Sequence, residues 1–247
     1  MTEFVSICEV GPRDGLQIAK TRMTTDDKVT WIKSLATAGI PEIEVGSFVP
    51  PRVIPQLSDT AEIVARVLAE IPGLTVQALA PNLRGAQNAF HAGVHKIAMP
   101  ISVSEGHSRA NLNRTTAESV EVMRGVMDWM KAQDRHVPVI MGASTAFGCS
   151  IDGVVTTAQT VALCKAMVGA GVQHIMLADT VGYAHPAQVK EVVRAVRAEI
   201  GPALYGLHLH DTCGLGIANA LAGLEEGIRV FDSSPTSRSG IHRATGR

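Results

Sequence analysis

The feature that most constrains this chain is a regular alternation of short apolar runs and longer segments with helical periodicity. Eight runs have the length and composition of buried strands, at 4–10, 42–46, 75–81, 96–102, 137–145, 174–179, 203–211 and 228–234. Seven segments between them carry apolar residues at helical spacing, at 24–39, 58–70, 84–92, 116–132, 156–170, 186–200 and 214–226. Alternating strands and helices form parallel sheets. Eight such units in this length predict an α/β fold, the (β/α)8 TIM barrel.

The ends of the helical segments agree with this interpretation. Thr24 or Thr25 can cap the first helix, and glycines stand just past the ends of four helices, at Gly39, Gly93, Gly171 and Gly227. A doubly wound open sheet is the competing architecture. It usually carries a glycine-rich GxGxxG turn after its first strand, and GPRDG at 11–15 does not match that pattern.

The last thirteen residues do not continue the pattern. PTSRSGIHRATGR has three arginines, no acid and one aliphatic residue larger than alanine, Ile241. We therefore expect one barrel domain over residues 1–234, an eighth helix that is missing or incomplete, and a disordered, aberrant tail at 235–247.

Composition narrows the class of protein. Net charge is −1, so neither a nucleic-acid surface nor a basic membrane patch is expected. No apolar run reaches the roughly 18 residues of a membrane span, and the first residues do not resemble a secretion signal. The four cysteines are widely separated, as in reduced cytoplasmic proteins. We expect a cytoplasmic protein.

Polar residues gather where the predicted strands end, which in a barrel is the catalytic face. Arg13 and Asp14 follow the first strand, Glu44 and Ser47 lie on or after the second, and Asp179 and Thr180 end the sixth. The seventh carries His208, His210 and Asp211, and the eighth ends near Asp232.

His208 and His210 are two residues apart on a strand, so both side chains face the same side. With Asp14 they form a two-histidine, one-carboxylate set that suits Mg²⁺, Mn²⁺ or Zn²⁺. Two hydrogen-bonded interior histidines are the alternative. A zinc site that includes Cys213 is disfavoured, because the turn after the strand should point that thiol elsewhere.

Arg13 offers a permanently charged, planar set of donors, and the glycines and proline around it fix its direction. Glu44 is its obvious ion-pair partner. Gln17 and Lys20 follow the turn, and a long polar loop at 102–113, with Arg109, is expected to contact substrate. The other histidines in the remaining helices, turns and strand beginnings are interpreted as structural or surface residues: His91, His95, His136, His174 and His185.

These motifs resemble the successive blocks of the hydroxymethylglutaryl-CoA lyase family, in order, from about residue 4 to 234: EVGPRDGLQ, IEVGSFVPPRVIPQLSD, ALAPNLRGAQNAFHAGVHKIAMPISVSEGHSRANLN, STAFGCSIDG, LADTVGYAHP and GLHLHDTCGLGIANALAGLEEGIRVFDSS. The resemblance implies metal-dependent retro-Claisen cleavage of 3-hydroxy-3-methylglutaryl-CoA to acetyl-CoA and acetoacetate, a reaction of leucine degradation and ketone-body formation. It implies Mg²⁺ or Mn²⁺ as the ion, an acyl-CoA ligand, and a homodimer as one option for assembly.

The resemblance also implies roles for residues. The metal ligands carry over to Asp14, His208 and His210, and the catalytic set to Arg13, Asp14, Glu44, Asp179 and His208, with His208 also in proton transfer. Substrate contacts carry over to Gln17, Lys20, Ser47 and Thr180.

The final segment departs from the family, which continues with a glycine-rich loop bearing a reactive cysteine and a metal-binding asparagine. Neither is found in SPTSRSGIHRATGR. The sequence therefore suggests a frameshift or truncation of an ordinary lyase, with weakened metal binding and rate. Two alternatives stay open: a lyase for another branched 3-hydroxyacyl-CoA, and a catalytically dead barrel that serves as a binding subunit.

Overall fold

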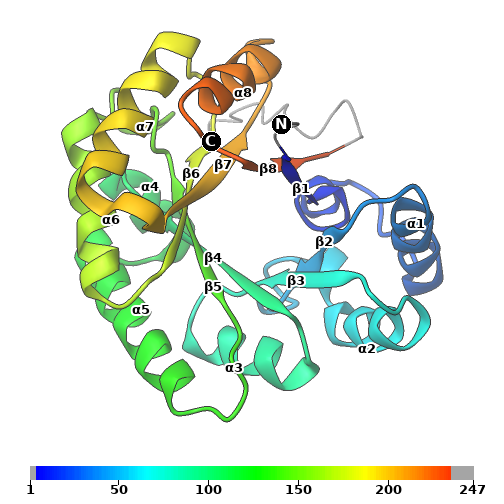
Figure 1. Ribbon diagram of the computed structural model, residues 1–247. Helices are drawn as coiled ribbons and strands as arrows, with labels where there is room; N and C mark the ends of the chain where they lie inside the picture. Colours follow the sequence, from blue (N-terminus) through cyan, green and yellow to red (C-terminus); the bar gives the residue numbers. More distant parts are fainter. Residues whose placement is uncertain (1–3, 235–247) are drawn as a thin grey trace.

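The computed structural model describes residues 4–234, and these form a closed barrel of eight parallel strands in chain order (Figure 1). The strands are β1 (Ser6–Glu9), β2 (Glu42–Ser47), β3 (Thr75–Leu79), β4 (Lys96–Ser102), β5 (Val139–Ser144), β6 (His174–Asp179), β7 (Leu204–Leu209) and β8 (Val230–Ser233). β1 pairs with β8 from Ser6↔Val230 to Glu9↔Ser233, which closes the ring. The predicted (β/α)8 fold is confirmed. We also expected no complete helix after β8 and a disordered tail at 235–247. Both expectations concern residues outside those that the structure describes.

Helices surround the barrel: α1 (Thr25–Thr37), α2 (Thr60–Glu70), α3 (Leu83–Ala92), α4 (Glu105–Leu112), α5 (Thr116–Lys131), α6 (Thr157–Gly169), α7 (Pro186–Ile200) and α8 (Gly216–Glu225). Thr24 caps α1 by accepting a hydrogen bond from the Asp27 backbone N–H. The four glycines predicted past helix ends have φ between 83° and 97°, the left-handed conformation that glycine adopts without strain. Among the described residues, no helix is long and apolar enough to cross a membrane.

The prediction of a long loop at 102–113 was wrong, because most of that segment is α4. Ser104 caps this helix by accepting from the His107 N–H, and Asn113 ends it in the left-handed conformation, with φ 52°. The helix is polar on most sides and buries only Ser108. It therefore lacks the apolar periodicity on which sequence-based helix prediction relies.

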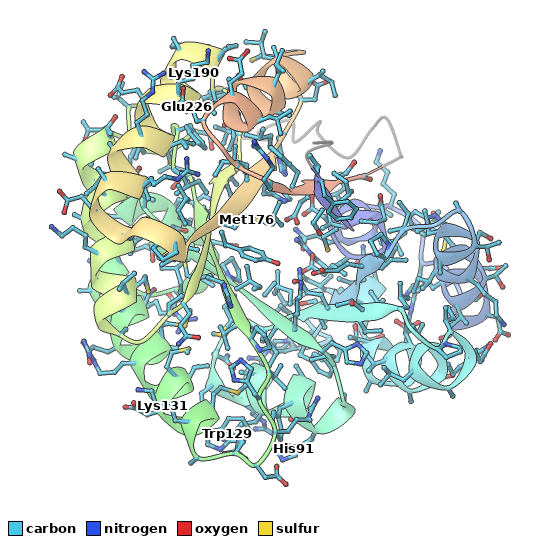
Figure 2. The ribbon with its side chains drawn as sticks, viewed as in Figure 1. His91, Trp129, Lys131, Met176, Lys190 and Glu226 are labelled. Atoms are coloured by element: carbon cyan, nitrogen blue, oxygen red, sulfur yellow. The ribbon has the colours of Figure 1, made fainter. Side chains whose placement is uncertain are left out.

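Several of the histidines interpreted as structural do make structural contacts. The Nδ1 atom of His95 accepts from the Val76 N–H at 3.0 Å, and the side chain of His185 caps α7. His91 lies on the outside of the helix ring, edge-on to the Trp129 ring at 6.1 Å between centroids (Figure 2). These three side chains therefore have structural roles.

The main core lies between the strands and the helices. On β4, Ile97, Met99 and Ile101 are at most 1% exposed, whereas the alternate residues Ala98 and Pro100 are only partly buried. This alternation follows the two-residue period of a strand. One face of β4 therefore packs against helices, and the other faces an interior that solvent can reach.

Candidate active site

The turn after β1 is a single π-helical turn, Gly11–Gly15, in which Arg13 and Asp14 are buried. The Asp14 N–H donates to the Val10 carbonyl at 2.7 Å, and the Gly11 N–H donates to the Glu9 carboxylate at 2.7 Å. A Cβ on Gly11 would lie 2.5 Å from Glu9 Oε1, closer than such atoms approach. Glycine at the start of the turn leaves room for the Glu9 carboxylate, and the turn holds the two charged side chains in the barrel mouth.

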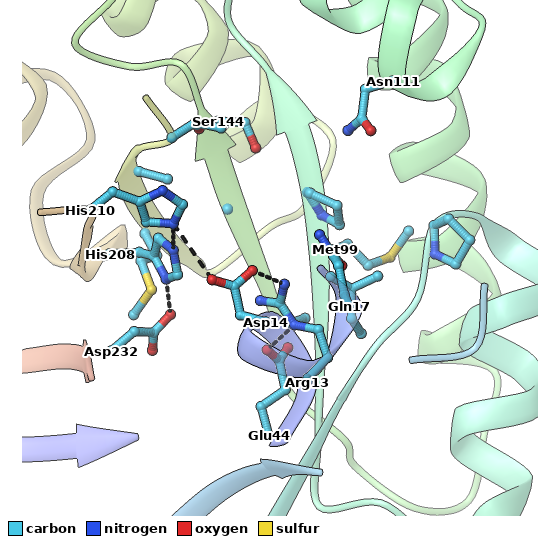
Figure 3. Close-up of a pocket in the computed structure, with 18 of the residues that line it drawn as sticks. Arg13, Asp14, Gln17, Glu44, Met99, Asn111, Ser144, His208, His210 and Asp232 are labelled. Atoms are coloured by element: carbon cyan, nitrogen blue, oxygen red, sulfur yellow. Dashed lines mark hydrogen bonds and ion pairs between the residues drawn. The ribbon is translucent and has the colours of Figure 1, made fainter. Parts of the chain in front are cut away.

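Arg13 lies between two carboxylates (Figure 3). Its Nε donates to Glu44 Oε2 at 2.5 Å, and its Nη1 donates to Asp14 Oδ1 at 2.6 Å. Burial alone would lower the pKa of Arg13, but the charges of Glu44 and Asp14 raise it above its usual value. Burial raises the pKa of Glu44, and Arg13 opposes that rise. The site therefore holds a permanently charged guanidinium, as the pairing of Arg13 with Glu44 suggested.

A second chain of contacts comes from β7 and β8. The Nε2 atoms of His208 and His210 lie 2.9 Å apart, and His208 Nδ1 lies 2.8 Å from Asp232 Oδ2. His210 Nε2 is 3.6 Å from Asp14 Oδ2, which links this group to the turn after β1 (Figure 3). Burial lowers the pKa of His208, but Asp232 and Asp14 outweigh that effect, so the pKa is raised.

Asp14, His208 and His210 have the donor set of a divalent-metal site. One ligand atom from each residue can be chosen so that all three lie within 4.8 Å of one another. Burial alone would raise the pKa of Asp14, yet Arg13 and the two histidines hold it well below its usual range, so the carboxylate is charged. Asp232 engages Nδ1 of His208, so Nε2, which contacts His210 Nε2 here, is the nitrogen that would face an ion, the arrangement common around metal-binding histidines. The residues fit a divalent cation.

These groups line one cavity of about 550 Å³ at the carboxyl ends of the strands. Gln17 and Thr180, both expected to contact substrate, lie on its wall together with Arg13, Glu44 and the two histidines. This volume is within the range of small-molecule sites in proteins.

Three other expected site residues lie elsewhere in the structure. Lys20 is exposed and does not line the cavity. Ser47 is buried on β2, where its hydroxyl accepts from the Val49 N–H at 3.2 Å.

Asp179 is fully buried, and its two oxygens accept from the Tyr183 and Ala184 N–H groups at 3.1 Å each. Burial raises the pKa of Asp179, and these hydrogen bonds lower it in part. Its carboxylate shapes the turn after β6 rather than the cavity wall.

Two features of the mouth were only partly visible in the sequence. Asp232 was noted at the end of the eighth strand but given no role, although the β1–β8 register, Cys8↔Asp232, brings it to the site. Gln77, a buried polar residue within the apolar run of β3, lines the cavity. A lone polar residue inside an apolar strand was the available signal. Arg109, by contrast, is exposed and pairs with Glu105 at 2.9 Å.

Comparison with known proteins places this site in a family. The HMGL-like family model matches residues 4–240. The chain is 39% identical to hydroxymethylglutaryl-CoA lyase YngG of Bacillus subtilis, over 98% of this chain and 80% of that protein. It is 38% identical to the cytoplasmic 3-hydroxy-3-methylglutaryl-CoA lyase of Mus musculus, over 100% of this chain and 71% of that protein.

A solved structure agrees with the sequence comparisons. The HMG-CoA lyase of Acinetobacter baumannii, in complex with coenzyme A and 3-methylmalate, superposes with a TM-score of 0.88 at 36% identity, over 95% of this chain and 76% of that one. The barrel, the Arg13–Asp14 turn and the two-histidine cluster thus occur together in a chain that belongs to the HMGL-like family of lyases.

Proposed function

We propose that this protein is a divalent-metal-dependent lyase that cleaves 3-hydroxy-3-methylglutaryl-CoA to acetyl-CoA and acetoacetate. The observation that carries the proposal is the contact between two functional groups. Asp14 belongs to the metal-ligand set, and the same carboxylate accepts a hydrogen bond from the buried guanidinium of Arg13 at 2.6 Å. Cleavage to an enolate uses both groups, a metal ion at the hydroxyl and a fixed cation at the enolate oxygen.

The chemistry requires three events. First, the 3-hydroxyl loses its proton. Second, the C2–C3 bond breaks as the C3 oxygen becomes a carbonyl, and the electron pair of that bond passes to the thioester half as an enolate. A proton then adds to C2 and gives acetyl-CoA. A bound divalent ion would supply Lewis-acid polarisation of the hydroxyl and lower its pKa. We propose Mg²⁺ or Mn²⁺ as that ion, with Zn²⁺ as an alternative, since the ligands are mixed nitrogen and oxygen.

We assign enolate stabilisation, proton transfer and substrate contact to the residues around the ion. Arg13 stabilises the enolate oxygen, because its charge is fixed in place by Glu44 and needs no reorganisation during the reaction. His208, oriented by Asp232, is the proposed proton carrier, and Gln17 and Thr180 are proposed substrate contacts on the cavity wall.

The other predicted partners and location are proposals of the same kind. The coenzyme A in the related solved structure supports an acyl-CoA substrate. The name of the mouse relative supports a cytoplasmic location. We therefore place the protein among cytoplasmic acyl-CoA lyases, where it would act in leucine degradation or ketone-body formation.

The test is to incubate the purified chain with 3-hydroxy-3-methylglutaryl-CoA and Mg²⁺ or Mn²⁺, and to measure acetoacetate. We expect turnover that a chelator abolishes and that added ion restores. Arg13→Gln should lower kcat by about 100- to 1,000-fold, the loss typical of one oxyanion donor. Arg109→Gln is the matched control, because that arginine is exposed on α4 and should leave the rate unchanged. Ligand binding without acetoacetate would instead identify a binding protein.

A further inference from the structure

The ionised groups of the cavity all lie on one side of it. Among the described residues, the carboxylates and guanidinium on its wall are those of Arg13, Asp14, Glu44 and Asp232, from β2, β8 and the turn after β1. β4 and β5 contribute no charged side chain to the wall. The closed order β1 to β8 puts β4 and β5 across the barrel from β8 and β1. The cavity thus has an ionic wall and, facing it, an uncharged one.

The uncharged wall is built mostly from small or apolar residues, and we call Ala98, Pro100, Ile140 and Gly142 the apolar wall. Ser144, at the carboxyl end of β5, adds a hydroxyl beside it. The β4–β5 register sets Pro100 beside Gly142 and Ala98 beside Ile140, so the four form a continuous patch on the inner face. Interiors of such barrels are usually filled by layers of bulky branched side chains. Only Ile140 is of that kind here, and the patch borders open space.

The surroundings of Gly142 show most clearly that other side chains do not fill the space beside the apolar wall. A Cβ built on it would have only Pro100 Cα within 4 Å, at 4.0 Å. Its φ is not positive, so the backbone there does not demand glycine. Gly206, on β7, is the opposite case, since a Cβ there would lie 3.0 Å from Met176 Cε and 2.7 Å from the Val230 carbonyl. Met176 lies inside the strand ring, in Figure 2, and fills the β7 side. The hollow is therefore on the β4–β5 side.

We propose that the apolar wall receives an apolar branch on C3 of the acyl-CoA that is longer than methyl. The inference rests on the proposed lyase function. If the hydroxyl and free carboxylate of the substrate bind at the ionic wall and the thioester arm leads out to solvent, the fourth substituent of C3 faces β4 and β5. A charged substituent would lose hydration there without gaining a counter-charge, whereas an alkyl branch fills the hollow.

The experiment compares 3-hydroxy-3-methylglutaryl-CoA with its 3-pentyl homologue as substrates of the full chain. We expect kcat/KM for the pentyl compound to be at least about tenfold higher, the discrimination that even one methylene can give in an apolar pocket. Gly142→Leu should lower the ratio of kcat/KM for the pentyl compound to kcat/KM for the methyl compound by at least about tenfold. Gly142→Ala should fall between wild type and Gly142→Leu, which keeps the test usable if leucine impairs folding.

Gly125→Leu is the matched control. A Cβ on Gly125 would have nothing within 4 Å, and this residue is exposed on α5, outside the cavity. Gly125→Leu should change kcat/KM for neither the methyl nor the pentyl compound. If wild type cleaves the methyl compound but not the pentyl one, or if Gly142→Leu slows both alike, the inference is overturned and the lyase function stands.

A binding measurement tests the role of the apolar wall without catalysis. The free acids 3-hydroxy-3-methylglutarate and 3-hydroxy-3-pentylglutarate are titrated calorimetrically into the chain with Mg²⁺ present. We expect the pentyl acid to bind at least about tenfold more tightly, and Gly142→Leu to remove that difference. Equal dissociation constants would overturn the inference. Tighter pentyl binding with no cleavage of either thioester would support the apolar wall and overturn the lyase function.

Discussion

Glu9 should make this protein less stable at neutral pH than in mild acid. The side chain is 1% exposed, and burial raises its pKa from an ordinary value of 4.5 to about 7, against the lowering effect of the hydrogen bond from the Gly11 N–H. Between these two values the unfolded chain has lost the proton that the folded chain still holds. The contribution of Glu9 to stability is therefore fully present below pH 4.5 and is lost as pH rises to about 7.

The size of the loss in stability follows from the interval between the two pKa values of Glu9. At about 1.4 kcal/mol per pH unit, the span from 4.5 to about 7 corresponds to a loss of about 3 kcal/mol. Glu9→Gln keeps an oxygen that can accept from the Gly11 N–H but carries no proton to lose. Above pH 7 it should therefore be more stable than wild type by up to about 3 kcal/mol, and the difference should nearly vanish near pH 4.5.

Urea unfolding at about pH 5 and about pH 8 measures this difference, with wild type and Glu9→Gln compared at each pH. Glu62→Gln is the matched control, because Glu62 is exposed on α2 and its neutralisation should shift both curves alike. If wild type and Glu9→Gln lose stability in parallel between the two pH values, the buried carboxyl is not the cause and the reasoning fails.

Three further substitutions test other contacts. Asp232→Ala should weaken Mn²⁺ binding by about 10- to 100-fold in a calorimetric titration, because His208 loses the group that orients it; unchanged affinity would argue against that role. Gly223→Val should lower the free energy of unfolding by about 1–3 kcal/mol, since a Cβ there would lie 2.3 Å from Leu207 Cδ1; wild-type stability in urea would contradict the close packing of α8 on β7. Arg13→Lys keeps the charge but loses the planar fork, so acetoacetate release should fall at least about 100-fold with the melting temperature little changed; full activity would show that charge alone suffices.

Most of the fold could be predicted because two independent signals agreed. The apolar runs marked the strands, and glycines such as Gly93 marked where four of the helices ended. α4 carried neither of these signals. Its cap at Ser104 was present, but no apolar stripe followed it, and a polar segment of that kind cannot be distinguished from a loop by periodicity.

The candidate site was predictable to the level of strand ends. Because parallel strands end on the same edge, Asp14, His208 and His210 could be expected to meet without knowledge of any coordinates. The direction of an individual side chain could not be predicted in the same way. Asp179 also stands at a strand end, yet its carboxylate turns to two backbone N–H groups of the following turn, a choice made by local geometry that its position in the sequence does not reveal.

The order of strands has a consequence for metal binding. Asp14 comes from the first strand unit and the histidines from the seventh, and these parts of the chain meet only because β1 pairs with β8. The proposed ligand set does not exist until the barrel closes, so a divalent ion would bind the closed state and not the open one. Ion at about 100 times its Kd should then stabilise closure by about 2.7 kcal/mol. That stabilisation should appear as slower hydrogen exchange of the amides that join β1 to β8, such as Ser6 and Val10, more than of those at the centre of β4 and β5.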